Sequence, residues 1–183
     1  MAVSSTMTPL GSTAPSFALT DVTTGDTVTL AQVQGERATV VVFICNHCPY
    51  VKHVNPQLVA VASDYAAKGV GFVAISANDP DSHPEDAPDK MAEVAAAEGY
   101  LFPYLHDDTQ DVARAYGAAC TPDLFAYDAD LHLAYRGRLD ASTPGNGEPL
   151  DGADLRAALD ALVAGTEVPT DQVPSMGCSI KWR

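Results

Sequence analysis

The chain has 183 residues, enough for one domain with a full hydrophobic core. Apolar residues make up 46% of the sequence, as in ordinary globular proteins. The formal net charge of −14 argues against nucleic acid or an anionic membrane as a partner, because both need a basic surface.

Residues 1–13 are rich in Ser and Thr and are expected to form a loose arm. No Lys or Arg precedes Arg37, and this region has no apolar run of the length found in secretory signals. No segment approaches the length of a transmembrane helix. We therefore expect a cytoplasmic protein, where paired cysteines are more often catalytic, redox-sensing or metal-binding than structural.

The first half of the chain predicts a hairpin followed by a β-α-β unit. The turn residues at 24–26 lie between two short apolar-polar runs, and residues 38–44 are a continuous β-branched run typical of a strand buried on both faces. From Val51 to Tyr65, apolar residues recur at helical spacing. The predicted elements are a hairpin over 17–19 and 27–30, strands over 38–44 and 70–75, and a helix over 51–68.

The second half predicts more helices and an antiparallel strand pair. Residues 78–89, rich in Pro and Asp, are interpreted as a mostly solvated loop. The predicted elements are helices over 91–98, 109–116 and 154–163, and strands over 123–127 and 131–136. The chain then ends in a tail, residues 166–183. The pattern indicates a single α/β domain over residues 1–183, with a mixed central sheet flanked by helices.

The motif Cys45-Asn46-His47-Cys48 lies where a predicted buried strand gives way to a helix, and Pro49 follows it. Backbone N–H groups at a helix start favour a nearby thiolate. Residues three apart in a helical turn face the same side, so the two sulfurs are within reach of a disulfide. We hypothesise that Cys45 has a lowered pKa and that a cationic His47 contributes to this.

A C-x-x-C motif is also compatible with a metal site. A zinc site would need a second pair of ligands, and the remaining cysteines, Cys120 and Cys178, are single, so no metal is expected. His47 on a solvated turn without a role remains an alternative. Redox chemistry is the favoured interpretation, as for a C-x-x-C near a β-α-β unit.

Three stretches carry a resemblance over roughly residues 9–165. They are GSTAPSFALTDVTTGDTVTLAQVQGERATVVVFICNHCP, the loop Cys120-Thr121-Pro122-Asp123-Leu124-Phe125, and the stretch LAYRGRLD at 133–140. They resemble the thioredoxin superfamily, specifically its branch toward peroxiredoxins of the alkyl hydroperoxide reductase/thiol-specific antioxidant type. The tail PSMGCSIKW is similar to that of a peroxiredoxin-like subgroup. The resemblance implies a thioredoxin-like fold with an N-terminal hairpin and a short helix, and thiol chemistry.

The resemblance also implies that the Thr121–Pro122 bond is cis and that its loop faces the two cysteines and the substrate. The chain departs from thioredoxin in having no acidic residue on the strand before the motif and Ile44 in place of a Trp. The group that takes the proton from the resolving thiol is therefore left open between His47 and water.

The expected function is thiol–disulfide exchange with protein or small thiols and a thiol reductase system, with Cys45 as nucleophile, Cys48 as resolving thiol and no organic cofactor. Cys120 and Cys178 are candidate accessory thiols, with simple packing as the alternative.

A thiol peroxidase is a second hypothesis, in which Cys48 reacts first and an Arg such as Arg136 or Arg138 assists. A non-enzymatic redox sensor is the third.

Overall fold

The computed structural model describes residues 2–183, and Met1 lies outside that range. Seven strands form the main sheet, in the order β3-β2-β6-β5-β4-β8-β9. β4 is parallel to β5, which is parallel to β6, and the other neighbouring pairs are antiparallel. The strands are β2 (Ala18–Asp21), β3 (Thr27–Thr29), β4 (Ala38–Phe43), β5 (Val70–Ser76), β6 (Tyr104–His106), β8 (Asp123–Asp128) and β9 (Leu133–Gly137). The expected mixed central sheet is confirmed.

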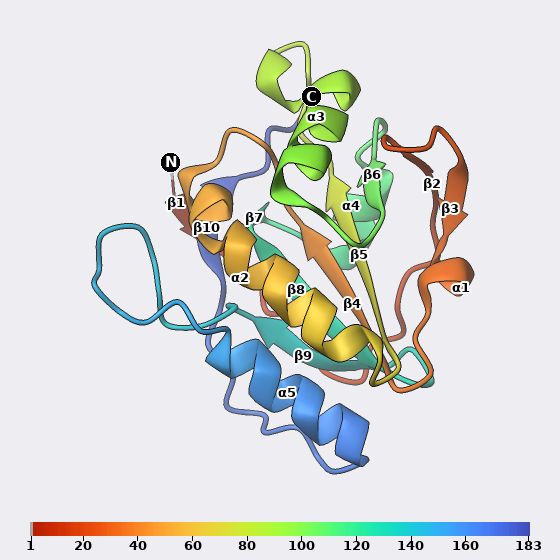
Figure 1. Cartoon of the computed structure of the whole chain (residues 1–183), viewed down its shortest axis with the longest axis vertical. Coiled ribbons are helices and arrows are strands. Elements are labelled where there is room, and N and C mark those ends of the chain that lie inside the picture. The colour runs from red at the N-terminus through yellow and green to blue at the C-terminus, as the bar shows by residue number, and fades with distance from the viewer. Residues whose placement is uncertain (1) are drawn as a thin grey trace.

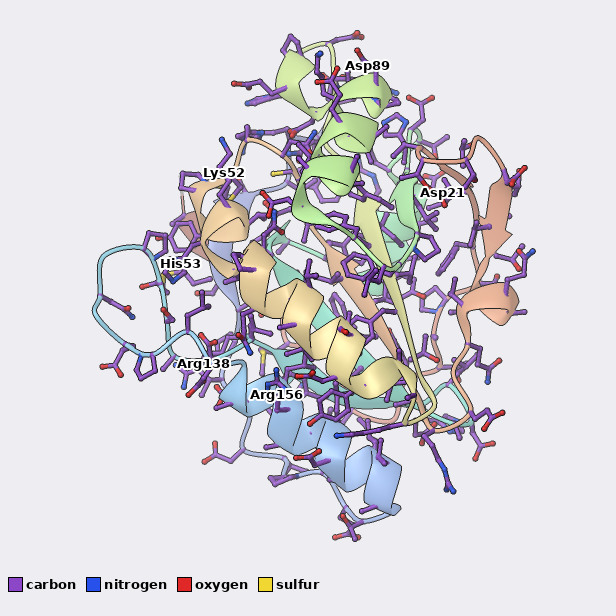
Figure 2. The ribbon with its side chains drawn as sticks, in the orientation of Figure 1. Asp21, Lys52, His53, Asp89, Arg138 and Arg156 are labelled. Carbon is purple, nitrogen blue, oxygen red and sulfur yellow. The ribbon has the colours of Figure 1, made fainter. Side chains whose placement is uncertain are left out.

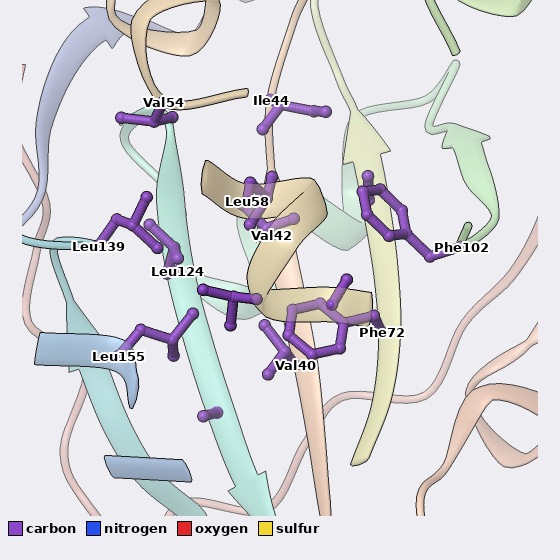
Figure 3. Close-up of a cluster of buried hydrophobic side chains, with 14 of the residues drawn as sticks. Val40, Val42, Ile44, Val54, Leu58, Phe72, Phe102, Leu124, Leu139 and Leu155 are labelled. Carbon is purple, nitrogen blue, oxygen red and sulfur yellow. The ribbon is translucent and has the colours of Figure 1, made fainter. Parts of the chain in front are cut away.

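β4 is an inner strand of the sheet, between β5 and β8, and every one of its residues is buried. Successive side chains of a strand point to opposite faces, so its β-branched run supplies two cores at once. Val40 and Val42 belong to one core, seen in Figure 3, whereas Val41 and Phe43 belong to the other. This double burial fixes the end of β4, from which the cysteine motif follows.

Helices cover both faces of the sheet (Figure 1). On one face lie α2 (Pro49–Ala66), α3 (Pro88–Glu98) and α5 (Ala153–Ala164), and their buried residues join the core that contains Val40. On the other face lies α4 (Asp111–Tyr116), together with Leu30 of the short helix α1 (Leu30–Val33). The helices expected after the motif, around residues 91–98 and 109–116 and near residue 160 are all confirmed.

The two ends of the chain meet in a second, three-stranded sheet in the order β1-β10-β7. β1 (Ala2–Ser4) pairs with β10 (Met176–Ser179), which pairs with β7 (Cys120–Thr121). The expectation of a loose N-terminal arm is therefore wrong for residues 2–4, because their backbone groups are hydrogen-bonded to the tail. This sheet lies beside the N-terminal end of α2 (Figure 1).

Within residues 2–183, no helix combines the length and the apolar character needed to cross a bilayer.

Candidate functional site

The cysteine motif occupies the junction between β4 and α2. β4 ends at Phe43, and α2 begins at Pro49, with Cys48 as its N-cap residue. Proline suits the first helical position because its missing N–H would have had no partner there. Cys45 and Cys48 are both buried free cysteines, with exposed fractions of 1% and 0%. The second cysteine of the motif therefore immediately precedes the first helical residue.

Both thiols contact one residue, Thr121. The Cys45 Sγ lies 3.2 Å from the Thr121 Oγ1, and the Cys48 thiol donates to the Thr121 carbonyl at 3.1 Å. The Thr121–Pro122 peptide bond is cis, as the resemblance implied. The structure thus brings Cys45 and Cys48 together with the Thr121–Pro122 loop, although each cysteine lies more than 70 positions from Thr121 in the sequence.

The two cysteines differ in their acidity. The interaction with Cys45 lowers the pKa of Cys48, and interactions with Cys178 and the Val51 N–H act in the same direction. The Thr121 carbonyl accepts from the Cys48 thiol and acts in the opposite direction, because it favours the protonated form. The pKa of Cys45 is raised, first by its hydrogen bond to Cys48 and then by burial. These directions favour the thiolate on Cys48, the residue at the helix start, whereas the sequence led us to expect it on Cys45.

Asp86 is a site residue that the sequence analysis missed. It is fully buried, and its Oδ1 accepts the backbone N–H groups of Asn46 at 2.7 Å and His47 at 3.2 Å. Its Oδ2 lies 2.6 Å from His47 Nδ1 and accepts the Asn78 amide at 2.8 Å. Asp86 ends the 3₁₀ turn Pro84–Asp86, inside the stretch interpreted as a solvated loop.

The same loop holds the residues between the two cysteines. Asn46 donates to the Glu85 carbonyl at 2.8 Å and accepts from Tyr104 at 3.2 Å, while the His47 ring stacks on His83 with centroids 4.7 Å apart. This stacking places His83, a residue of the same loop, beside the motif. No sequence signal distinguished Asp86 from the other acidic residues of the loop, because its burial depends on how the loop folds back.

Cys45, His47 and Asp86 also place ligand-type atoms within 4.8 Å of one another. Both oxygens of Asp86 already accept N–H groups, and one of these hydrogen bonds comes from His47 Nδ1. The geometry is therefore that of a hydrogen-bonded His–Asp pair next to a thiol.

The two other cysteines lie close to the pair but differ in exposure. Cys120 is fully buried, its thiol donates to the Pro122 carbonyl at 3.5 Å, and burial raises its pKa. Cys178 is partly exposed and lies opposite Thr121 in the β10–β7 pair. Burial and a hydrogen bond to Cys48 raise the pKa of Cys178 to about 11.

A cavity of about 130 Å³ flanks the cis-proline loop. It is lined by Pro122, by Tyr50 at the start of α2, by His53 and by Met176 of the tail. Lys52 lines a separate depression beside His47. Figure 2 shows Lys52 and His53 near the N-terminal end of α2, the end that carries the motif. Tyr50 and Lys52 thus line two different depressions near the motif.

The two arginines considered for peroxide chemistry make hydrogen bonds elsewhere. Arg136 donates to the Thr8 carbonyl at 2.8 Å and to Gln172 at 2.6 Å, whereas Arg138 is paired with Asp154 at 2.6 Å. Arg138 is labelled in Figure 2. In this arrangement the guanidinium groups are held by groups outside the motif.

Comparison with known proteins identifies the family. Residues 10–136 match the AhpC/TSA family, which is more than half of the chain, and the chain belongs to this family. Two Mycobacterium tuberculosis proteins that carry peroxiredoxin in their names are 31% identical over 112 residues. The match covers 61% of this chain and 65% of each relative, so the chain spans less than two thirds of their length. The family indicates thiol-based oxidoreductase or peroxidase chemistry in general terms.

Two solved structures are similar over almost the whole chain. An uncharacterised conserved protein from Geobacillus kaustophilus is 57% identical, with a TM-score of 0.99 over 100% of this chain and 97% of the other. A hypothetical protein from Sinorhizobium meliloti is 47% identical, with a TM-score of 0.96 over 98% of both chains.

More distant structures share the fold alone. A thiol:disulfide interchange protein from Chlorobium tepidum is 21% identical, with a TM-score of 0.66 over 85% of this chain and 98% of the other. The thioredoxin-like fold and the peroxiredoxin-type branch expected from the sequence are confirmed.

Proposed function

We propose that this protein is a thiol–disulfide oxidoreductase whose redox pair is Cys45 and Cys48. The observation that supports this best is that both sulfurs contact Thr121, next to the cis-proline. Disulfide exchange needs two neighbouring thiols and an adjacent surface for the substrate chain. Pro122 lines the cavity that Tyr50 and Met176 also line, and this cavity is the candidate docking place for a thiol or disulfide substrate.

The position of Cys48 at the start of α2 supports a particular order of events, because a helix start stabilises a thiolate. In this order Cys48, whose pKa is lowered, attacks one sulfur of the substrate disulfide and expels the other as a thiolate. Cys45 then loses its proton and attacks the Cys48 sulfur, which forms the Cys45–Cys48 disulfide and releases the second substrate thiolate. This order is the reverse of the one expected from the sequence, where Cys45 attacked first.

His47 and Asp86 are proposed to receive the proton from Cys45. The carboxylate fixes the His47 tautomer with a proton on Nδ1, which leaves Nε2 free to act as a base. The negative charge of Asp86 is among the causes that raise the pKa of Cys45, so the two groups interact electrostatically. A thiol reductase system is the expected source of electrons for the next cycle.

The test is turnover of a peptide disulfide with a thiol reductant, followed by mapping of the disulfides in the protein. Wild type should form the Cys45–Cys48 disulfide after one equivalent of substrate, and Cys48→Ser should fall to the uncatalysed rate. Cys120→Ala, which removes a buried thiol outside the pair, is the matched control and should keep the rate. Equal turnover by wild type and Cys48→Ser would contradict the proposal.

A peroxidase is the second candidate, and one observation favours it. Cys48 is the residue with the lowered pKa, at the first turn of a helix, in a chain of the AhpC/TSA family. Hydrogen peroxide would then oxidise Cys48 to a sulfenate far faster than it oxidises a free cysteine, and Cys45 would condense with the sulfenate. The rate of thiol loss after one equivalent of peroxide separates the candidates. Chemical oxidation without turnover on either substrate would instead indicate a redox sensor.

A further inference from the structure

Cys178 is the remaining thiol near the pair and it comes from the opposite end of the chain. In the antiparallel pair β10–β7 it faces Thr121, so the two side chains lie on the same side of the small sheet. The Thr121 hydroxyl on that side contacts Cys45 and the Thr121 carbonyl contacts Cys48. Cys178 also packs against the buried core that includes both cysteines.

Cys178 lies opposite Thr121, whose carbonyl accepts from the Cys48 thiol, so the tail places its thiol beside the pair. An interaction with Cys178 is also among the causes that lower the pKa of Cys48. A thiolate exchanges with a disulfide by attacking the sulfur it faces, and the other sulfur leaves. From this arrangement, an attack by Cys178 on Cys48 would expel Cys45.

Cys178 is more exposed to solvent than the two cysteines of the pair. Cys45 and Cys48 have exposed fractions of 1% and 0%, while Cys178 is partly exposed. The tail strand also occupies the backbone edge of β7, the edge at which an extended peptide would add a strand beside Thr121. Gly177 allows this close approach, because a Cβ there would overlap the Thr121 carbonyl oxygen.

We propose that Cys178 is an internal exchange partner of Cys48, which carries the oxidised state of the buried pair to the surface through the tail. The proposal rests on the redox role of Cys45 and Cys48 proposed above. After the pair is oxidised, the Cys178 thiolate attacks the Cys48 sulfur, a Cys48–Cys178 disulfide forms, and Cys45 leaves as a thiolate that takes up a proton. No net oxidation occurs in this step. An external dithiol reductase then reduces the Cys48–Cys178 disulfide at its partly exposed sulfur.

The acidity of Cys178 fits this sequence of events. In the reduced protein its hydrogen bond to Cys48 is one of the causes that raise its pKa to about 11. When Cys48 is part of a disulfide, this bond to a thiolate is lost and the Cys178 thiol ionises more readily. Cys178 is therefore protected while the pair is reduced and becomes a nucleophile once the pair is oxidised.

The deciding experiment uses the Cys45→Ser variant. The reduced variant is treated with one equivalent of oxidised glutathione, quenched by alkylation and mapped by mass spectrometry. We expect glutathione to leave Cys48 and a Cys48–Cys178 disulfide to accumulate. In the control Cys45→Ser/Cys178→Ser, which retains buried Cys120, glutathione should stay on Cys48. A glutathione adduct that persists on Cys48 in Cys45→Ser, with Cys178 alkylated, would overturn the proposal.

Wild-type protein provides a second measurement that does not depend on the folding of a variant. Partial oxidation should yield both the Cys45–Cys48 and the Cys48–Cys178 linkages in the map. If only Cys45–Cys48 is found, the proposed redox pair stands and the role of Cys178 is overturned. If neither linkage forms and no turnover is seen, the proposed function itself fails.

Discussion

Asp86 is the residue that holds the motif in its shape. With two backbone N–H groups on one oxygen and two side-chain donors on the other, it satisfies four donors from Asn46, His47 and Asn78. A buried carboxylate is stable only when such partners compensate for its desolvation. Replacing one of its oxygens by an amide nitrogen therefore changes both stability and the tautomer of the histidine.

We predict that Asp86→Asn lowers the free energy of unfolding by about 1–3 kcal/mol, because the Asn78 amide then faces another donor. His47 would accept from the new amide at Nδ1 and carry its proton on Nε2, so the base proposed for Cys45 is lost. Denaturant unfolding measures the first effect, and the rate at which the Cys45–Cys48 disulfide forms measures the second.

The neighbouring exposed carboxylate provides the control for this substitution. Glu85→Gln changes the same charge one position earlier, and only the backbone carbonyl of Glu85 contacts the motif. It should leave both measurements near the wild-type values. A stable Asp86→Asn variant with an unchanged rate would show that the carboxylate is not needed to position His47.

The tail strand β10 is the element that closes the site, and its docking depends on one glycine. A side chain at position 177 would meet the Thr121 carbonyl and the Pro122 nitrogen. We predict that Gly177→Ala costs about 1–3 kcal/mol of unfolding free energy, as other overpacked sites do. Because β10 must move away from β7, alkylation of Cys48 should become faster, and this rate is the second measurement.

Met176→Ala is the matched control on the same strand. Met176 has an exposed fraction of 49%, so its truncation creates no clash with the cis-proline loop. It should leave the alkylation rate of Cys48 within the range of wild type. If Gly177→Ala behaves in the same way, the backbone of β10 does not shield the pair.

The elements predicted correctly from the sequence are those with a strong local pattern. Residues 38–44 are apolar apart from Thr39, and the helix after Cys48 shows apolar residues at regular steps, so each segment by itself indicates that it is buried. β7 and β10 have two and four residues, and they exist because segments far apart in the chain pair with each other. Such pairing leaves no periodic signal.

For the site, too, some features could be predicted from the sequence and others could not. The spacing of Cys45 and Cys48 indicated thiol chemistry, and the resemblance placed the Thr121–Pro122 loop beside them. Which of the two cysteines, Cys45 or Cys48, has the lowered pKa could not be predicted. It depends on where α2 begins and on interactions with Val51 and the tail residue Cys178. One acidic residue of the loop 78–89 became part of the site only through tertiary contacts.

The molecule as a whole carries a buried acid that makes its stability depend on pH. Asp123 follows the cis-proline on β8, has an exposed fraction of 1%, and its Oδ1 has no hydrogen-bond partner in the part of the chain that the structure describes. Burial raises its pKa from 3.8 to about 7, although Ala119 and Cys120 backbone N–H groups oppose this. The folded protein therefore binds a proton that the unfolded chain releases near pH 4.

The sign of the effect follows from this difference in proton binding. Between pH 4 and 7 the folded state holds more protons than the unfolded state, so the free energy of unfolding contributed by Asp123 falls as the pH rises. The contribution is complete below the unfolded pKa of 3.8 and is lost as the pH passes the folded value of about 7. At about 1.4 kcal/mol for each pKa unit, the total is about 4 kcal/mol.

Asp123→Asn should remove this penalty while keeping an oxygen for the Ala119 N–H, which donates to Asp123 Oδ2 at 3.1 Å. We predict that the variant becomes progressively more stable than wild type between pH 4 and 7 and that the difference levels off above pH 7. Denaturant unfolding across this range measures it. Asp128→Asn, at the other end of β8 where the side chain is 39% exposed, should not reproduce the trend. A stability difference between Asp123→Asn and wild type that stays constant with pH would mean that Asp123 is already ionised in the folded protein, and its orphaned oxygen would then need another partner.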